Sequence, residues 1–417
     1  MVPKKVALMI HPFYTQAAAA FDAGVAAADP AEAVRRSLPE FDRPPTVIAV
    51  GKAAVSMARM ARSLLGPVPA LVVVTNPENA ARAQELPPMP EERIFAAAHP
   101  IPDQIGLQAA QAVKAALIAA SQAGRPVLCL ISGGGSALLP APVAGVSLQD
   151  KIAVNAQLLA SGADIEVMNL IRQQLSELKG GGMLRYAAPS PVTALILSDV
   201  IGDDLRAVAS GPTVAPIGRK AQARDILQRL TLWHRLPETV RRVLQSADVP
   251  QDLPEARNLL IGSNGQSLAA MGAAYPTATL HPQPLIGDVT EAVRRIADMG
   301  RGAHVFGGET TVKLTGTGRG GRNQDLALRL ALLAEAEGWK APWLYLQAGT
   351  DGRDGPTDAA GGVVCETTLS EIRAAGLDPA GLLGNNDAYR ALAAAGGLHI
   401  TGATGTNVAD LGILIRS

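Results

Sequence analysis

The stretch T-V-I-A-V-G-K-A-A-V-S-M-A-R-M-A-R-S-L-L, residues 46–65, decides the class of fold. Its first five residues are mostly apolar and partly β-branched, which predicts a buried strand. From residue 53 the apolar side chains recur at helical spacing, and the pattern stops before Gly66 and Pro67, which predicts a helix. A strand that leads directly into a helix is typical of α/β proteins, in which helices cover a largely parallel sheet.

The same alternation of strands and helices continues along the chain. Apolar runs typical of strands covered on both faces occur at 70–75, 93–98, 127–131 and 192–199. Residues 147–187 have helical spacing, with the triplet Gly180, Gly181 and Gly182 as a predicted helix end. A second series of strands is predicted at 258–264, 304–314, 343–352 and 408–415.

Length and composition limit the organisation of the protein. We predict two domains, residues 1–250 and 251–417, because 417 residues exceed what one hydrophobic core usually serves. The proline-containing region 214–255 has no strong strand, and it is the predicted connection. The two cysteines, Cys129 and Cys365, each lie in an apolar run, which indicates buried side chains rather than a disulfide or a zinc site.

Charge and hydropathy disfavour several classes of partner. Lys plus Arg equals Asp plus Glu at 37 each, so no net charge draws the chain to nucleic acid or to an anionic membrane. No apolar run reaches the length of a membrane span. The apolar N-terminal run is interrupted by His11 and Pro12 and lacks a cleavage site, so we predict no signal peptide and a cytoplasmic location.

Polar residues follow the predicted strands at the sheet edge where α/β proteins bind ligands. The turn S-G-G-G-S (132–136) follows the strand at 127–131, and its backbone N–H groups can converge on a phosphate. The alternative is a tight strand-to-helix turn; a Walker A loop is excluded because no G-K-[ST] follows. Lys52 can reach a phosphate at the same edge, or it is a solvated surface lysine.

Grouped carboxylates are candidates for a metal site. Asp199, Asp203 and Asp204 follow the strand at 192–199 and can hold Mg²⁺; we favour Asp199, because the other two are equally good helix caps. A second polar loop, T-D-G-R-D-G-P-T-D (350–358), offers Asp351, Asp354 and Asp358 as ligands or a base, without the order of an EF-hand loop. Glu309 is a further candidate acid, unless it faces solvent from its strand.

Glycines 316, 318 and 321 form a G-x-G-x-x-G pattern between a strand and a helix. In a nicotinamide-binding protein, a buried strand precedes this pattern and an acidic residue ends the next strand about 20 residues on. Here the preceding strand alternates polar with apolar residues, and no such acid is found. We therefore predict that the glycines let Arg319, Arg322, Asn323 and Gln324 converge on an anion. His99 is predicted to be a structural turn residue.

Several of these motifs together resemble the glycerate 2-kinase family, whose C-terminal domain is of the MOFRL type and which was long labelled hydroxypyruvate reductase. They occur in order from Gly51 to Gly362: G-K, S-G-G-G-S-A-L-L, S-D-V-I-G-D-D, A-S-G-P-T, G-G-E-T-T-V, G-R-G-G-R-N-Q-D and G-T-D-G-R-D-G-P-T-D-A-A-G. The resemblance implies a Rossmann-like N-terminal domain, a smaller α/β C-terminal domain and an active cleft between them. It also implies transfer of phosphate from ATP, with Mg²⁺, to D-glycerate, which gives 2-phosphoglycerate.

The family's lysine and arginine at the cleft match Lys52 and Arg322. Phosphoryl transfer needs cations and metal around the moving group and little covalent chemistry from the protein, and the residues above supply these parts. Lys52, Arg322 and Asp351 are the predicted catalytic residues, with Asp351 as a base. The remaining assignments are ATP at Ser132, Gly133, Gly134, Gly135, Ser136 and Asn323, glycerate at Arg319, Arg322 and Glu309, and Mg²⁺ at Asp199 and Asp351.

Two other functions remain open from the sequence: an NAD(P)H-dependent hydroxypyruvate reductase and a sensor that binds a nucleotide or a sugar acid without turnover. The reductase hypothesis depends on one short glycine pattern, and a sensor does not explain so many polar loops at strand ends. The sequence does not decide between a monomer and a homodimer, or between glycerate and close relatives such as tartronate.

Overall fold

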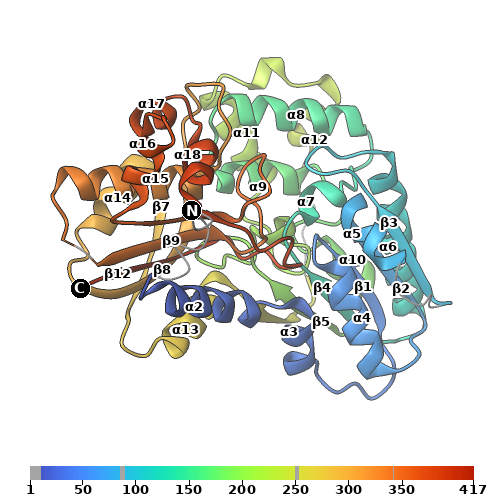
Figure 1. Ribbon diagram of the computed structural model, residues 1–417. Helices are drawn as coiled ribbons and strands as arrows, with labels where there is room; N and C mark the ends of the chain where they lie inside the picture. Colours follow the sequence, from blue (N-terminus) through green and yellow to red (C-terminus); the bar gives the residue numbers. More distant parts are fainter. Residues whose placement is uncertain (1–10, 85–89, 249–252, 341) are drawn as a thin grey trace. The chain divides into compact units, whose positions relative to one another are not determined.

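The computed structural model describes residues 11–84, 90–248, 253–340 and 342–417 (Figure 1). The chain divides into two compact units. Residues Pro30–Ile261 form the first, here called the inserted unit; residues through Asp29 together with Gly262–Ser417 form the second, here called the split unit. The predicted boundary at residue 250 and residues 1–10 of the predicted leaderless N-terminus lie outside the described residues.

The inserted unit alternates strands with helices, as the sequence predicts. Its elements are α3 (Pro30–Ser37), β1 (Thr46–Val50), α4 (Ala54–Leu65), β2 (Leu71–Thr75), α5 (Pro77–Gln84), β3 (Glu92–Ala96), α6 (Gln104–Gln122), β4 (Val127–Ile131), α7 (Gly135–Leu138), α8 (Leu148–Ala160), α9 (Ile165–Gln174), α10 (Gly182–Ala187), β5 (Val192–Leu197), η1 (Val208–Ser210), α11 (Lys220–Arg229), η2 (Trp233–Arg235), α12 (Glu238–Gln245) and β6 (Ala256–Gly262).

The sheet of the inserted unit has the strand order β3-β2-β1-β4-β5-β6. β1 pairs in parallel with both β2 and β4, with Ile48 opposite Val72 on one side and Cys129 on the other. The chain builds the sheet outward from β1 in one direction and from β4 in the other, so the order reverses between these two strands. Open α/β sheets bind ligands at this switch point, beyond the carboxyl ends of the strands.

The core of the inserted unit explains why its strands are so apolar. Ile48, Val50 and Cys129 point into a cluster with buried residues of α6 and α10, while α3 and α4 lie on the other face of the sheet (Figure 1). Every residue of β1, β2 and β4 is buried. Helices on both faces leave no solvated side to these strands, hence their continuous apolar runs.

Two expectations about the middle of the chain are corrected. The strand at 258–264 was expected to open the second series, but β6 extends the first sheet beside β5. The region 214–255 was expected to connect the domains, but α11 and α12 form a helical layer with α8 and α9 around Leu158, Ile171 and Trp233. Its apolar residues at helical spacing, such as Val240 and Leu244, are buried in that layer.

The split unit begins with a helix from the start of the chain and continues after β6. Its elements are α2 (Tyr14–Ala27), α13 (Asn264–Ala274), β7 (Thr279–Asp288), α14 (Val289–Ala297), β8 (Gly302–Thr311), α15 (Arg322–Ala336), β9 (Trp343–Gly349), β10 (Gly361–Cys365), α16 (Thr368–Ala374), α17 (Pro379–Gly384), α18 (Ala388–Ala395), β11 (Leu398–His399) and β12 (Asp410–Arg416).

The sheet of the split unit is mixed, with the order β11-β10-β9-β12-β8-β7. β7 and β8 are parallel, whereas β12 runs antiparallel to both of its neighbours, β8 and β9. Helices α2 and α13 cover one face, where Phe21 and Met271 pack on Leu411. Helices α14 to α16 and α18 cover the other face, around Phe306 and Tyr345. The α/β class with two different sheets confirms the predicted fold class.

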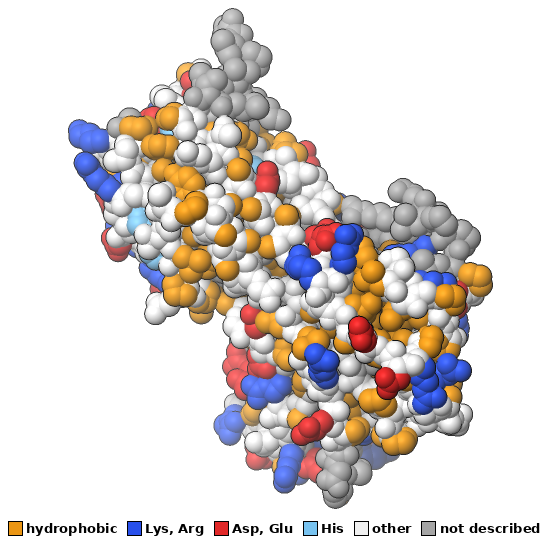
Figure 2. Space-filling view, turned by 90° about the horizontal axis from the view of Figure 1, so that it is seen from below, with side chains coloured by type: hydrophobic (Ala, Val, Ile, Leu, Met, Phe, Trp, Pro, Cys, Tyr) orange, Lys and Arg blue, Asp and Glu red, His pale blue; other side chains and the backbone are white. Residues whose placement is uncertain are grey.

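The surface reflects the balanced composition of the chain. On the face shown in Figure 2, basic and acidic side chains are interspersed, as equal numbers of the two kinds would allow. Among the described helices, none combines the length and apolar character needed to cross a bilayer.

Candidate functional site

The carboxyl ends of β1 and β4 interlock at the switch point of the inserted unit. Lys52 donates its backbone N–H to the carbonyl of Gly133 at 2.9 Å, and Ala53 donates its own to Ser132 Oγ at 3.1 Å. Gly51 has a φ of 126°, and a Cβ there would lie 2.2 Å from Ser132 Oγ. Only glycine allows this close approach. The structure therefore brings Lys52 to the turn at 132–136, although the predicted contacts with ATP remain predictions.

The glycine turn presents unpaired backbone donors. The N–H groups of Gly133, Gly134, Gly135 and Ser136 have no acceptor within the described part of the chain. Gly134 is left-handed, with a φ of 82°. A turn in which successive N–H groups point to one side is a common anion-binding geometry. This arrangement supports phosphate binding over the alternative of a purely structural turn.

A strained segment, residues 209–210, packs against the turn. Ala209 and Ser210 have φ values of 50° and 60°, a left-handed conformation that costs energy for residues other than glycine. A Cβ on Gly135 would lie 2.8 Å from Ala209 Cβ, so the two segments are in tight contact. Ser210 Oγ is 2.8 Å from both Ser136 Oγ and Asn169 Oδ1. These bonds fix the position of Ser136, and such strained segments often lie at functional sites.

Of the three aspartates after β5, Asp199 is the one at the glycine turn. A Cβ on Gly133 would lie 1.8 Å from Asp199 Oδ2, so the carboxylate occupies the space beside this glycine. Asp204 instead pairs with Arg206 at 2.8 Å in a local turn, and it does not cap the following helix η1, whose N-cap is Ala207. Carboxylate oxygens are the ligands that Mg²⁺ prefers, so the position of Asp199 is compatible with the predicted metal site.

His99 also lies beside the turn, because a Cβ on Gly134 would be 3.5 Å from its ring and 3.2 Å from Lys52 Cγ. Burial, and to a smaller extent the charge of Lys52, lower the pKa of the His99 imidazole. The ring is therefore neutral at pH 7 and adds no charge to the site. Asn79 Nδ2 donates to the carbonyl of Lys52 at 2.8 Å and fixes the backbone from which the lysine extends.

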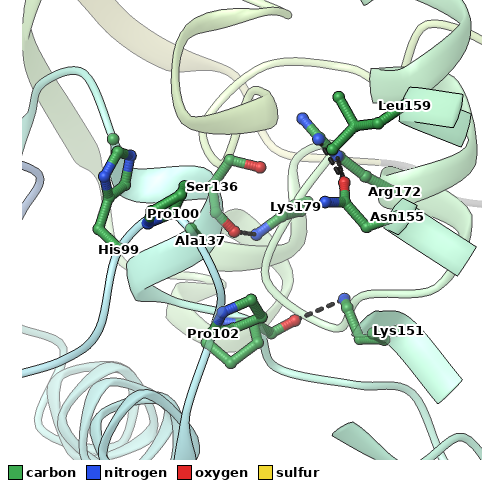
Figure 3. A pocket seen from close by; sticks show the side chains of 12 residues that line it. His99, Pro100, Pro102, Ser136, Ala137, Lys151, Asn155, Leu159, Arg172 and Lys179 are labelled. Carbon is green, nitrogen blue, oxygen red and sulfur yellow. Dashed lines mark hydrogen bonds between the residues drawn. The ribbon is translucent and has the colours of Figure 1, made fainter. Parts of the chain in front are cut away.

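A pocket of about 250 Å³ adjoins the turn. Lys151 from α8, Arg172 from α9 and Lys179 after α9 line one side, and His99 lies across from them (Figure 3). Lys179 is only 4% exposed. Burial, together with the neighbouring cations, lowers the pKa of Lys179 well below its usual value, and burial and Arg172 lower that of Lys151 to about 7.

The sequence analysis missed these three cations. Lys151 and Arg172 lie in helices whose pattern predicts only an amphipathic surface, where basic residues are ordinary. Lys179 precedes the glycine triplet that was interpreted as a helix end. The glycines have a stricter role, since Gly180 and Gly181 are left-handed and a Cβ on Gly182 would lie 2.1 Å from a backbone oxygen. The one signal in the sequence that could have identified Lys179 is its position directly before three consecutive glycines.

The predicted residues of the split unit gather around Arg322 at the start of α15. Its guanidinium binds Asp410 through Nε at 2.6 Å and Nη2 at 3.0 Å, and Glu309 through Nη1 at 2.8 Å. The Asp410 side chain is 2% exposed, against 32% for Arg322. Burial raises the pKa of Glu309, while the charge of Arg322 lowers it. Sequence reasoning missed Asp410, which lies near the start of the apolar run 408–415 and carries no motif.

The glycine loop at 316–321 is filled by the protein itself. Asn386 Oδ1 accepts from the N–H groups of Thr315 and Gly316, and Asn385 and Asp387 accept from those of Thr317, Gly318 and Arg319. A Cβ on Gly318 would lie 2.4 Å from Asp387 Cβ. The glycines are therefore explained by the close approach of residues 385–387.

The helix that follows this loop is also capped from within. Asp354 accepts from the backbone N–H groups of Asn323 at 3.1 Å and Gln324 at 2.8 Å. Burial raises the pKa of Asp354 to about 7, although these donors act against it. The side chains of Asn323 and Gln324 are buried and bonded to Gln347 and Thr357. Because the side chains of Asn323 and Gln324 are bonded inside the split unit, Arg319, Arg322, Asn323 and Gln324 do not converge as the group of four that the sequence predicted.

The last two predicted residues are more exposed. Arg319 lies over the ring of Tyr389, 4.8 Å from its centroid. Asp351 accepts the N–H of Arg353 at 2.9 Å, and its charge contributes to the raised pKa of Glu309. Asp351 thus lies in the carboxylate group around Arg322, whereas its predicted role as a base is not tested by the geometry.

Comparison with known proteins places the chain in a family. The domain of unknown function DUF4147 matches residues 16–245, and the MOFRL family matches residues 302–410. A D-glycerate 2-kinase from Thermotoga maritima is 38% identical over 403 residues, which are 92% of this chain and 93% of that protein. The chain belongs to the glycerate 2-kinase family. This confirms the resemblance drawn from its motifs.

The structure agrees with this membership of the glycerate 2-kinase family. A crystal structure of glycerate kinase from Thermotoga maritima is similar to it with a TM-score of 0.87, at 36% identity and 99% coverage of both chains. An Agrobacterium vitis relative, 39% identical over 94% of this chain and 92% of its own, is provisionally named a hydroxypyruvate reductase. The name of this relative matches the alternative function considered from the sequence, a hydroxypyruvate reductase.

Proposed function

We propose that this protein is a glycerate 2-kinase, which transfers the terminal phosphoryl group of ATP to the 2-hydroxyl of D-glycerate. The observation that carries the proposal is the glycine turn at 132–136, whose unpaired N–H groups lie beside Lys52 at the switch point of the parallel sheet. The proposed substrate, D-glycerate, is inferred from family membership, since the relative from Thermotoga maritima is named D-glycerate 2-kinase.

The proposed reaction is an in-line displacement at phosphorus. The 2-hydroxyl oxygen of glycerate forms a bond to the γ-phosphorus, and the bond from that phosphorus to the β,γ-bridging oxygen breaks. The electron pair leaves with ADP, and the hydroxyl proton passes to a base, for which we propose Asp351. Charge builds on the phosphoryl oxygens, so the protein's main task is to hold cations and N–H donors around them.

The switch point offers the required donors. We propose that the N–H groups of Gly133 to Ser136 and the ammonium group of Lys52 hold the phosphates of ATP. Arg322 keeps the role that the family resemblance implies, and Arg319, Glu309 and Asn323 keep the roles assigned from the sequence, all as proposals. Among these, Asn323 has the weakest support, because its side chain is 1% exposed and bonded inside the split unit.

Mg²⁺ is part of the proposal, with Asp199 and Asp351 as its ligands. Among the described residues, only His11, Cys365 and Glu366 form a preassembled three-ligand group, so neither aspartate belongs to an all-protein cage. This suits Mg²⁺, which usually takes one or two carboxylates and completes its shell with water and phosphate oxygens. When bound, Mg²⁺ would neutralise charge on the transferring phosphate.

One pair of assays separates the kinase from the reductase. Purified protein is mixed with ATP, Mg²⁺ and D-glycerate, and ADP release is measured; in parallel, NADH and NADPH oxidation is measured with hydroxypyruvate. We expect ADP release that depends on glycerate, and no oxidation of either nicotinamide. Oxidation without ADP release would replace the proposal by the reductase, and binding without turnover in both assays would favour a sensor.

The position of the new phosphate and the need for metal are tested on the same mixture. Phosphorus on the 2-oxygen couples to one carbon-bound proton and gives a doublet in the ³¹P spectrum, whereas phosphorus on the 3-oxygen gives a triplet. We expect the doublet. Removal of Mg²⁺ with EDTA should abolish ADP release, and added Mg²⁺ should restore it. We place the reaction in the cytoplasm, where cell fractionation should find the protein.

A further inference from the structure

The pocket beside the glycine turn gathers three cations without an acidic partner. No Asp or Glu in the described chain pairs with Lys151, Arg172 or Lys179, and none contributes to their pKa shifts. Elsewhere in this unit, partly buried cations do have partners, as Lys114 has Glu177 at 2.6 Å. Burying like charges together is costly unless an anion compensates them.

Each of the three groups keeps donors free for such an anion. Lys151 Nζ donates to the carbonyls of Pro140 and Leu175, at 2.6 and 3.0 Å. Lys179 Nζ donates to those of Ser136 and Leu139, both at 2.8 Å. A protonated lysine has three donors, so one remains on each side chain once an anion in the pocket stabilises the charged form. Because neutral oxygens hold both ammonium groups in place, their positions do not depend on the ligand.

Arg172 keeps the largest donor surface. Its Nε and Nη2 both donate to Asn155 Oδ1, which leaves Nη1 and one N–H of Nη2 without an acceptor among the described residues. Arg322, the arginine that the sequence assigned to the substrate, has Nε, Nη1 and Nη2 all bound to Asp410 and Glu309. A guanidinium bound to a neutral amide is the better receptor for a new carboxylate, because no anion must first be displaced.

The size and position of the pocket indicate which anion it holds. Pockets for drug-sized ligands usually span about 300–1,000 Å³, and this one is smaller, at about 250 Å³. It shares Gly134 and Ser136 with the glycine turn. An acid of three carbons that is anchored by its carboxylate in the pocket would thus have its hydroxyl next to the phosphates proposed to bind the turn.

We propose that the pocket of Lys151, Arg172 and Lys179 binds the carboxylate of the small hydroxy acid that accepts the phosphoryl group. This inference rests on the proposed kinase function and adds the residues that select the acceptor. It moves the carboxylate-binding role from Arg322 to Arg172. The phosphates of ATP are the other anions that the same cations could hold, and the test below separates the two.

The test compares Arg172→Gln and Lys151→Met with the wild-type protein. Removal of one charge-assisted hydrogen bond should raise the KM for D-glycerate roughly 10- to 100-fold and leave the KM for ATP within about twofold. Arg242→Gln and Lys114→Met are the matched controls. Arg242 pairs with Glu238 on α12 and Lys114 with Glu177, both outside the pocket, so neither KM should change.

A binding measurement makes the result independent of turnover. Titration calorimetry with D-glycerate, without nucleotide, should show binding to the wild-type protein and the two controls and a 10- to 100-fold weaker affinity in the two pocket variants, by the same estimate. Far-ultraviolet circular dichroism checks that each variant is folded. Lys179 is not substituted, because its two bonds to backbone carbonyls make misfolding a simple alternative.

The outcomes are distinguishable. An unchanged glycerate affinity in folded Arg172→Gln protein overturns the inference, as does a rise in the KM for ATP alone, which would assign the pocket to phosphate. If the wild-type protein binds glycerate through Arg172 but releases no ADP, the proposed function fails while the acid-binding site stands. If the wild-type protein releases ADP with glycerate and the pocket variants match it in both KM values, the function stands and the site fails.

Discussion

The two glycine-rich turns of this protein look alike in sequence and differ in what satisfies their backbone. Both follow a strand and open a helix. In the turn at 132–136 the N–H groups of four successive residues have no acceptor in the described chain. In the loop at 316–321, by contrast, side chains of residues 385–387 accept from the backbone, and Asp354 caps the helix. The second loop therefore has acceptors for the N–H groups of residues 315–319 and 323–324, whereas the first turn keeps four successive donors for a ligand.

Glycines in such a turn indicate that another group lies very close to the backbone, but the glycine pattern does not identify that group. In the first turn, glycine at position 133 makes room for the carboxylate of Asp199; in the second, glycine at 318 makes room for Asp387. A dinucleotide fingerprint needs free N–H groups at the helix start. Because Asp354 occupies that position at 316–321, the pattern gives no support to a nicotinamide site.

The largest effect is expected at the first turn. Lys52→Met removes a cation whose side chain lies beside Gly134 of this turn, and kcat with ATP and glycerate should fall about 10²- to 10³-fold, the usual cost of losing one group that stabilises developing charge. Steady-state kinetics measures this, with Lys114→Met as the control. Turnover within twofold of the wild type would show that this turn does not hold the reacting phosphates.

Substitution at Arg322 should affect stability more than its place in the sequence suggests. Arg322→Ala leaves Asp410 without a cation, and because that carboxylate is buried, the free energy of unfolding should fall by about 2–3 kcal/mol. Urea denaturation measures the loss. Turnover should also fall if the family resemblance gives Arg322 its role.

The double variant Arg322→Ala with Asp410→Asn separates the two effects, because it removes the orphaned charge as well. Stability restored in part with turnover still lost would confirm a direct role in the reaction. Turnover that recovers together with stability would make Arg322 a purely structural residue.

Matched glycine substitutions test the comparison directly. Gly133→Ala places a methyl group against Asp199, and we expect a reduction in kcat of roughly tenfold, about 1.4 kcal/mol, with a smaller change in stability. Gly318→Ala places one against Asp387, and we expect about 1–3 kcal/mol of destabilisation with unchanged KM values. Kinetics and denaturation on both variants are needed. If the pattern is reversed, the assignment of the two turns is reversed too.

The smallest effect is expected at the internal cap of the second turn. Asp354→Ala removes the acceptor of the Asn323 and Gln324 N–H groups, which should cost about 0.5–2 kcal/mol of stability. We expect the KM for ATP to stay unchanged, a result that would make Asp354 a cap for the fold alone and would argue against the proposed role of Asn323, whose side chain Asp354 also contacts. Thermal unfolding and nucleotide kinetics check both statements; a changed KM for ATP would mean that the helix start contacts the nucleotide.

Most of the fold was predictable because it depends on local patterns. Strands such as Thr46–Val50 are buried on both faces, and their sequences show it. The place of β6 was not predictable, since a strand at the edge of a sheet can pair with either of two sheets and its own pattern does not say which. The position of helix α2 was not predictable either, because an Ala-rich sequence is compatible with a helix but does not indicate which surface the helix covers.

The site was predictable where function requires an unusual local sequence. The turn at 132–136 and Lys52 stand out because few other roles explain three glycines between two serines, or a lysine directly after a buried strand. Lys151, Arg172 and Lys179 were missed because each is ordinary in its own helix or turn, and only the packing of α8 and α9 brings them together. Asp410 was missed for the same reason.

The inserted unit interrupts the sequence of the split unit, and this affects the order in which the two units can fold during synthesis. A ribosome releases residues 30–261 as one uninterrupted segment, so that half can fold while synthesis continues. Helix α2 emerges earlier still, but its partner α13 is made only after the inserted unit, and its partner β12 later still. It must wait through most of translation with Phe21 uncovered, which makes it a natural point of contact for chaperones in the nascent chain.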